Sequence, residues 1–401
     1  MLALVAFCVA LGFGIVVPAV PLFAKQFGVS NTAAGAVVSA FALMRLLSGL
    51  GGGQLVDRVG ERLALLVGLG IVAVSSVLAG LSVSYPQLLV LRGVGGVGSA
   101  LFTIAATSLL LRVAGASQRG RTQSVYRGGF LLGGIIGPAF GGAVIGISLR
   151  APFFLYAATL ALGMLAAGTL LPRAALRPVP SQVAMGVGED DGLPDAVVPV
   201  PRTTLSSALR SPAYRAALAG NFAIGFSVLG VRSTLVPLLI VGRLKLAPGW
   251  IGAAFVVAAL VQAVLLLPAG RAVDEIGRKP MLLAGGGLSA VSLGLLALVS
   301  GPVSLLAVMA VFAVGAALLG VAPAAIVGDV VEGRGGQPIA IWQMASDLGS
   351  VIGPVAAGAL IDRGSYDLAL AVSAVVVAAC TTLGLRMPTP PRSDALTRPA
   401  A

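Results

Sequence analysis

The chain has 401 residues, of which 58% are hydrophobic and 10% are charged, and its mean hydropathy is +1.03. A water-exposed surface needs a larger share of charged residues, so the composition excludes a soluble protein. Stretches of about 20 apolar residues recur along the chain, which is the length that crosses a hydrocarbon core about 30 Å thick. The sequence therefore predicts an all-α integral membrane protein.

The composition also excludes several functional classes. Because histidine is absent, imidazole metal sites, catalytic triads and imidazole proton relays are ruled out. Cys8 and Cys380 lie in apolar segments, so we expect neither a disulfide framework nor a zinc site. No lysine follows a glycine, which excludes a P-loop. We expect no enzyme activity, no cofactor and no metal, and the net charge of +12 is better explained by loop anchors than by nucleic-acid binding.

Apolar runs between charged or turn-forming breaks predict twelve membrane spans in two groups of six. They cover residues 3–24, 33–55, 63–84, 86–111, 122–147 and 151–172, then 213–241, 249–270, 279–300, 302–328, 337–361 and 366–387. The predicted domains are a six-helix bundle over 1–172, a Pro-rich cytoplasmic linker over 173–212, a second six-helix bundle over 213–387 and a cytoplasmic tail over 388–401.

An even number of spans places both termini on one side of the membrane. Seventeen Lys and Arg residues fall in the termini and connections of that side, and only five fall in the connections of the other side. Those five are Lys25, Arg150, Arg243, Lys245 and Arg363. Cytoplasmic loops carry the excess of positive charge, so we expect a multi-pass protein of the cell membrane with both termini cytoplasmic and a retained first span.

The two groups of spans repeat each other at an offset of 216 or 217 residues. The matches pair Pro21-Leu22 with Pro237-Leu238, Gly53/Asp57/Gly60 with Gly270/Asp274/Gly277, and Gly133/Gly137-Pro138/Gly142 with Gly349/Gly353-Pro354/Gly358. Three ordered matches at nearly one offset indicate duplication of a six-helix unit. Two pseudo-symmetric bundles are therefore expected.

The connection after the second span reads GQLVDRVGERLAL from Gly53, and the connection after the eighth reads GRAVDEIGRKPML from Gly270. Both resemble the G-x-x-x-D-R-x-G-R-R/K loop of the major facilitator superfamily, which lies between helices 2 and 3 and returns between helices 8 and 9. The resemblance covers nearly the whole chain. It implies a substrate cavity between the two halves and alternating access.

The resemblance also implies a gating role for this loop, which docks beneath helix 11 when the inner gate is shut. Glycines would permit the tight turn, and Asp57 with Arg58 and Arg62 would form a charged latch. Glu61 and Glu275 depart from the family pattern, and the alternative is a set of solvated turn residues. The gating candidates are Gly53, Asp57, Arg58, Gly60, Arg62, Gly270, Asp274, Gly277 and Arg278.

Two further motifs lie within predicted spans. Arg92 lies in LVLRGVGGVGSALF, which resembles the family's R-x-x-Q-G motif with Gly95 in place of glutamine. The fifth span contains GGIIGPAFGG, which resembles the G-x-x-x-G-P-x-x-G-G motif of drug/proton antiporters and implies export. Ordinary packing of small residues between helices is the alternative. The residues of this motif are Gly133, Gly137, Pro138, Gly141 and Gly142.

Charges within the spans are few, and each costs about 2.5–3.5 kcal/mol at a helix centre on insertion scales. Asp347 is the only deep acid and the first candidate for proton binding, with Arg45 and Arg92 as candidate partners. At 1.5 Å per residue, Arg45 and Asp347 lie about 12 Å and about 15 Å from the inner ends of their spans. Helices 2 and 11 face each other in the family that the chain resembles, so the resemblance implies that the two side chains meet in one conformation and part in the other. A static ion pair is the alternative. The cavity candidates are Tyr126, Arg127, Asn221, Arg232, Trp342 and Gln343.

Together these features predict a secondary active transporter that exports a small organic compound or drug in exchange for protons by alternating access. A symporter or uniporter for a sugar or another small solute is the alternative, and a transport-inactive receptor or scaffold is a remote one. The expected partners are the small-molecule substrate, protons and the lipid bilayer. We expect a monomer and no nucleic-acid partner.

Overall fold

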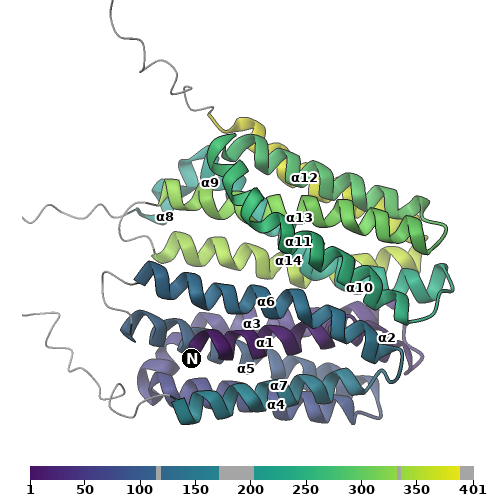
Figure 1. Cartoon of the computed structure of the whole chain (residues 1–401), viewed down its shortest axis with the longest axis horizontal. Coiled ribbons are helices and arrows are strands. Elements are labelled where there is room, and N and C mark those ends of the chain that lie inside the picture. Colours follow the sequence, from purple (N-terminus) through teal and green to yellow (C-terminus); the bar gives the residue numbers. More distant parts are fainter. Residues whose placement is uncertain (114–118, 171–202, 332–335, 389–401) are drawn as a thin grey trace, which may run out of the picture.

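The computed structural model describes residues 1–113, 119–170, 203–331 and 336–388 (Figure 1). Over these residues every regular element is helical, and twelve spans are long and apolar enough to cross a membrane. The predicted fold class is confirmed.

The helices follow the predicted spans to within a few residues. The first half contains α1 (Leu2–Val16), α2 (Val20–Lys25), α3 (Asn31–Val59), α4 (Glu61–Gly80), α5 (Tyr85–Val113), α6 (Arg119–Ile145) and α7 (Ala151–Leu170). The second half contains α8 (Leu205–Arg210), α9 (Pro212–Ile224), η3 (Gly225–Val231), α10 (Arg232–Leu238), η4 (Leu239–Arg243), α11 (Gly249–Glu275), α12 (Arg278–Leu295), η5 (Leu296–Leu298), α13 (Pro302–Val330), α14 (Gly336–Arg363), α15 (Tyr366–Thr382) and η6 (Leu383–Arg386).

Two predicted segments differ from the structure in detail. The first span is broken between α1 and α2 at residues 17–19, where Pro18 lacks the N–H that a continuous helix needs. The predicted linker over 173–212 lies outside the described residues as far as residue 202. It then contains α8, which begins where the Thr204 hydroxyl accepts a hydrogen bond from the N–H of Ser207 and which buries Ala208.

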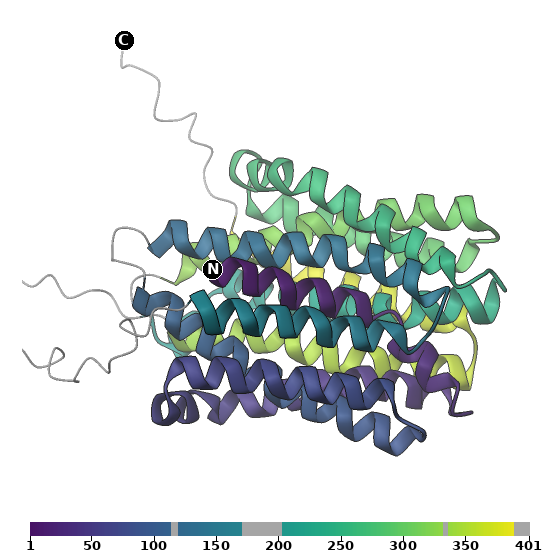
Figure 2. The same ribbon diagram turned by 60° about the horizontal axis from the view of Figure 1, so that its bottom comes forward.

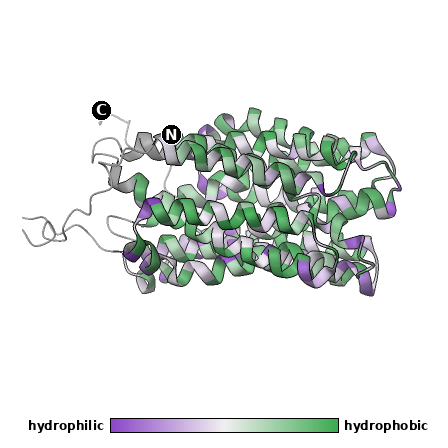
Figure 3. Ribbon diagram, turned by 90° about the horizontal axis from the view of Figure 1, so that it is seen from below, coloured by the Kyte–Doolittle hydropathy of each residue, from purple (hydrophilic) through white to green (hydrophobic). Residues whose placement is uncertain are grey.

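The long helices run roughly side by side along the bundle (Figures 1 and 2). We call the end at which α1 begins the near end, and the end at which α3 begins the far end. Hydrophobic residues cover most of the length of the helices, and hydrophilic residues gather toward the two ends (Figure 3). This distribution fits a bilayer around the middle of the bundle.

Each half has its own hydrophobic core. One cluster of buried residues belongs entirely to the first half, and the other is built almost entirely from the second half. The exceptions are Ala19, Leu22 and Ile145, three far-end residues of the first half that belong to the second cluster. The two halves therefore share apolar packing at the far end.

Glycines close both interfaces between the halves at the far end, where α3 packs against α14 and α6 packs against α11. A side chain at Gly35 would overlap the backbone of Pro354, and one at Gly142 would overlap the backbone of Gly252. Gly35 and Gly252 are equivalent positions of the repeat. Toward the near end of α3, by contrast, Gly49 and Gly53 have open space beside them. The far end is thus tightly closed, and α3 is more loosely packed toward the near end.

Candidate functional site

An ion pair between Arg45 of α3 and Asp347 of α14 joins the two halves near the middle of both helices. The two side chains are 32% and 19% exposed, so the pair lies neither in bulk solvent nor in a dry core. The contact expected from the depths of the two residues and from the family resemblance is therefore present. The role of the pair in proton transfer stays a prediction.

No second carboxylate lies near this pair in the described spans, and this determines its chemistry. Among the described residues, Asp347 is the only acid that lies far from the ends of a membrane-spanning helix. Withdrawal from water favours the neutral form of a carboxyl group, and a neighbouring guanidinium favours its charged form. A proton on Asp347 would cancel the charge that holds Arg45. The structure shows the paired form of the site.

Arg92 of α5 contacts Phe41 of α3, which lies one helical turn from Arg45. Arg92 is buried, and its guanidinium carbon stands 4.6 Å from the centre of the Phe41 ring. Phe41 and Arg45 are four residues apart on α3, so they share one face of that helix. Arg92 has no carboxylate partner in the described part of the chain, and its buried Nε has no hydrogen bond. The sequence alone did not predict Phe41 as the partner of Arg92, because the contact joins two helices.

Arg232 is a partly buried cation of the second half. It begins α10 directly after the π-helix η3, and its guanidinium carbon lies 5.3 Å from the ring of Phe255 and 5.8 Å from that of Phe312. Its Nε is also buried without a hydrogen bond, and no described acid pairs with it. Arg92 and Arg232 therefore each lie against aromatic rings without a carboxylate partner among the described residues.

Among the described side chains of the remaining cavity candidates, the structure shows a contact only between Asn221 and Trp342. The amide of Asn221 in α9 donates a hydrogen bond of 2.6 Å to the carbonyl of Trp342 in α14. The indole N–H of Trp342 and the hydroxyl of Tyr126, at equivalent positions of the repeat, are buried without partners. Gln343 is exposed, and the side chain of Arg127 lies outside what the structure describes. Buried polar groups without partners are costly, and a bound polar molecule would satisfy them.

The glycine motif of α6 contacts two different helices. Side chains at Gly133, Gly137 and Gly141 would each overlap the backbone of α1, whereas Gly142 faces Gly252 of α11 in the other half. Pro138 lies within α6 and packs on α1 beside Gly14. The motif therefore packs one half internally and also forms part of the far-end contact between the halves.

Substitution of Gly137 tests this packing, because an added methyl group would strike the α1 backbone. Overpacking of this kind costs about 1–3 kcal/mol. We expect Gly137→Ala to lower the thermal unfolding midpoint of the purified protein. The matched control is Gly134→Ala on the same helix, where nothing lies within 4 Å of the added carbon. Equal midpoints for the two variants would contradict the close α1–α6 contact.

The gating candidates divide into turn and helix positions. Gly60 and Gly277 have φ values of +83° and +114°, so each allows the turn that begins the next helix. Gly53 and Gly270, which begin the two motifs, lie inside α3 and α11, which continue to Val59 and Glu275. The predicted spans ended at residues 55 and 270, so both helices run a few residues further than expected.

The charged loop residues make contacts within their own halves. The guanidinium of Arg62 donates to the carbonyl of Gly168 at 2.8 Å. Arg278 bridges two helices, with Nε 2.8 Å from a carboxylate oxygen of Asp329 and Nη2 3.6 Å from one of Asp274. Arg58 is exposed, and the side chain of Asp57 lies outside the described residues.

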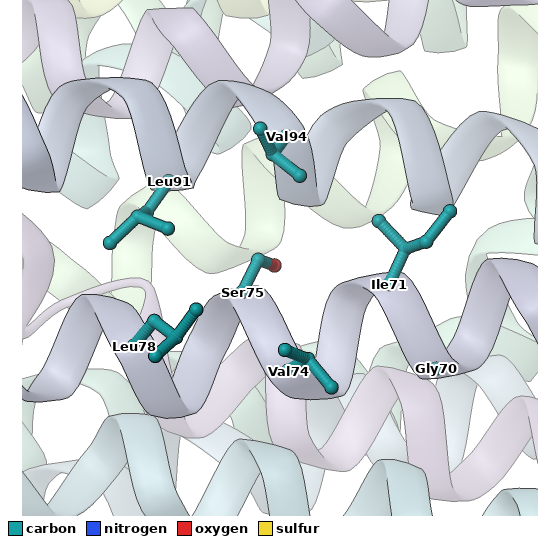
Figure 4. A pocket seen from close by; sticks show the side chains of 7 residues that line it. All are labelled: Gly70, Ile71, Val74, Ser75, Leu78, Leu91 and Val94. Carbon is teal, nitrogen blue, oxygen red and sulfur yellow. The ribbon is translucent and has the colours of Figure 1, made fainter.

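A pocket of about 350 Å³ opens between α4 and α5 (Figure 4). Ser75 is its only polar side chain, and the hydroxyl of Ser75 donates to the carbonyl of Val72 in its own helix. The other lining residues are Gly70, Ile71, Val74, Leu78, Leu91 and Val94. The pocket holds no charged group, so it is a poor candidate for proton coupling.

The fold and the site together define a membrane transporter built of two six-helix halves. The sequence pattern of the Major Facilitator Superfamily matches residues 2–246 and 220–400, and the chain belongs to this family. Multidrug resistance protein 2 of Bacillus subtilis (strain 168) is 26% identical over 361 residues, which are 89% of this chain and 86% of that protein.

Two further similarities support the assignment. Quinolone resistance protein NorA of Staphylococcus aureus (strain MRSA252) is 30% identical over 164 residues, which are 40% of each protein. The crystal structure of a bacterial homolog of the human lysosomal transporter Spinster, inward-facing and unoccupied, matches 96% of this chain and 93% of that chain. Its TM-score is 0.68 at 16% identity, which shows the shared fold.

Proposed function

We propose that this protein exports a small organic compound in exchange for protons, by alternating access between the two halves. The observation that carries the proposal is the ion pair of Arg45 and Asp347, which spans the interface between the halves. The similarity to a multidrug resistance protein and the glycine motif of α6 support export. The alternative, a symporter or uniporter for a nutrient, would use the same fold with the opposite direction of coupling or with none.

Growth of a drug-sensitive bacterial strain that expresses the protein tests this proposal. We expect resistance to at least one compound of a panel of toxic organic molecules, and we expect Asp347→Asn to remove it at an equal amount of protein in the membrane. Increased sensitivity to a compound would favour uptake and contradict export.

The near end is proposed to face the cytoplasm, because most basic residues of the loops lie there. In a chain whose two native cysteines are replaced, Val83→Cys at the far end should react in intact cells with a membrane-impermeant thiol reagent. Val83 is 79% exposed, which suits it to labelling. Ser206→Cys at the near end should react only after permeabilisation. Labelling of Ser206→Cys in intact cells would reverse the orientation.

The charge of the interior suggests the class of substrate. Asp347 is paired, whereas Arg92 and Arg232 lack acidic partners in the described part of the chain. A guanidinium remains charged at all physiological pH values, so these groups favour anions or acceptor-rich neutral molecules.

We therefore expect faster export of carboxyfluorescein, an anionic dye, than of rhodamine 6G, a cationic dye of similar ring size. Arg232→Gln should slow the export of carboxyfluorescein, while Arg232→Lys, which keeps the charge, should slow it less. The measurement is dye efflux from preloaded cells. Faster efflux of the cation would contradict this expectation and leave proton-coupled export standing.

A further inference from the structure

Asp362, the next-to-last residue of α14, binds the first turn of α3 in the other half. Its Oδ1 accepts hydrogen bonds from the backbone N–H of Asn31 at 3.0 Å and from the side-chain amide of Asn31 at 2.8 Å. Its Oδ2 accepts hydrogen bonds from the backbone N–H of Thr32 at 2.8 Å and from the Thr32 hydroxyl at 2.7 Å. One carboxylate thus receives four hydrogen bonds from the opposite half.

The helix termini explain why an acid lies here. A carboxylate at the C-terminal end of its own helix is disfavoured by the helix dipole, and one at the N-terminal end of a helix is favoured. The first N–H groups of a helix have no partner within that helix. Ser30 already accepts from Ala33, and Asp362 satisfies the N–H groups of Asn31 and Thr32. The charge of Asp362 is therefore favoured by the N-terminal end of α3 and disfavoured by the C-terminal end of α14.

This contact lies beside closely packed positions of the interface between α3 and α14. A side chain at Gly358 would overlap the backbone of Asn31, and the hydroxyl of Ser39 donates to the carbonyl of Val351 at 2.6 Å. The far end cannot open between these helices unless the four hydrogen bonds of Asp362 break.

The internal repeat shows that this contact exists once. The position equivalent to Asp362 in the first half is Gly146, which has no side chain to bind the start of α11. The α6–α11 interface is closed at the far end by the contact of Gly142 with Gly252. A single substitution should therefore weaken the polar contact without a second copy to replace it.

We propose that Asp362, Asn31 and Thr32 form a far-end lock, which holds the far gate closed and must release α3 when that gate opens. This role rests on the alternating access of the proposed function. The helices α3 and α14 run in opposite directions, and Asp57 stands near the C-terminal end of α3 as Asp362 does in α14. Asp57 thus lies at the near end and Asp362 at the far end. The lock that the structure shows is at the far end, which is closed.

The test measures how often the far gate opens. In a chain without Cys8 and Cys380, Ser39→Cys places a thiol in the far-end interface, where Ser39 is 5% exposed. We expect Asp362→Asn to raise the rate at which an impermeant thiol reagent labels this cysteine in intact cells. The increase should be roughly twofold to thirtyfold, the range for loss of a helix N-terminal cap.

The matched control is Asp367→Asn, because Asp367 lies at the same end but pairs with Arg243 within its own half. Thr32→Val, which removes one of the four donors, should give a smaller increase than Asp362→Asn. The thermal unfolding midpoint of each purified variant shows whether the chain still folds. Equal labelling rates for Asp362→Asn and Asp367→Asn would overturn the lock. The labelling needs no substrate. If the protein exports substrate and the two variants are labelled at equal rates, the lock is refuted and the proposed export is not.

Discussion

Asp347→Asn is expected to abolish proton-driven transport while exchange of substrate for substrate continues. Asparagine keeps the size of the side chain but cannot bind and release a proton at this position. The variant would lock the site in one charge state, and a carrier in one charge state can still move a bound substrate in both directions. We expect proton-driven efflux to fall at least about tenfold, which corresponds to about 1.4 kcal/mol. The measurement is dye efflux with and without a proton gradient.

Two further variants separate coupling from packing. Arg45→Ala leaves Asp347 without its partner and should shift the pH at which transport is half-maximal. Asp329→Asn removes a carboxylate that binds Arg278 at the near end of the second half and should leave this pH unchanged. If both Asp347→Asn and Arg45→Ala transport at normal rates with unchanged pH dependence, the ion pair is a packing contact without a role in coupling.

Asp57→Asn is expected to insert into the membrane normally and to lose nearly all turnover. Asp57 lies near the end of α3, the helix that packs along α14. If Asp57 binds the near end of α14 when the near gate closes, the variant would close that gate rarely. Turnover should fall about tenfold or more, because each cycle must pass through the state in which the near gate is closed.

Asp274→Asn at the equivalent position of the second half is the matched control. The carboxylate of Asp274 lies 3.6 Å from Arg278, and Arg278 also binds Asp329, so this cluster belongs to one half. Its loss should slow turnover less than threefold, since exposed ion pairs contribute little. Equal and mild effects of the two substitutions on efflux would show that the first loop is a simple connection.

The sequence was sufficient for the helices and for one contact between the halves. Apolar length predicts the spans because hydrocarbon leaves the backbone no partner other than its own helix. The depths of Arg45 and Asp347 followed from counting residues along helices of known rise. The resemblance to the family supplied which helices face each other. These three steps placed the ion pair without knowledge of any other side chain.

Other parts of the site depend on tertiary contacts that no local pattern records. Asp362 follows the end of a predicted span and could have been a solvated loop residue. Its partners Asn31 and Thr32 are about 330 residues away in sequence. The stacking of Arg92 on Phe41 likewise joins two separate helices. The ends of α3 and α11 were underestimated by a few residues, because both helices continue past Gly53 and Gly270 into a charged segment.

The direct test of the central proposal is the proton movement that accompanies substrate movement in liposomes containing the purified protein. The liposomes are loaded with a transported compound and with pyranine, a trapped pH indicator, and are then diluted into compound-free buffer. Exchange for protons predicts that the interior becomes more acidic as the compound leaves, and that Asp347→Asn removes this signal. An interior that becomes more alkaline as the compound leaves would show symport and contradict the exchange proposed here.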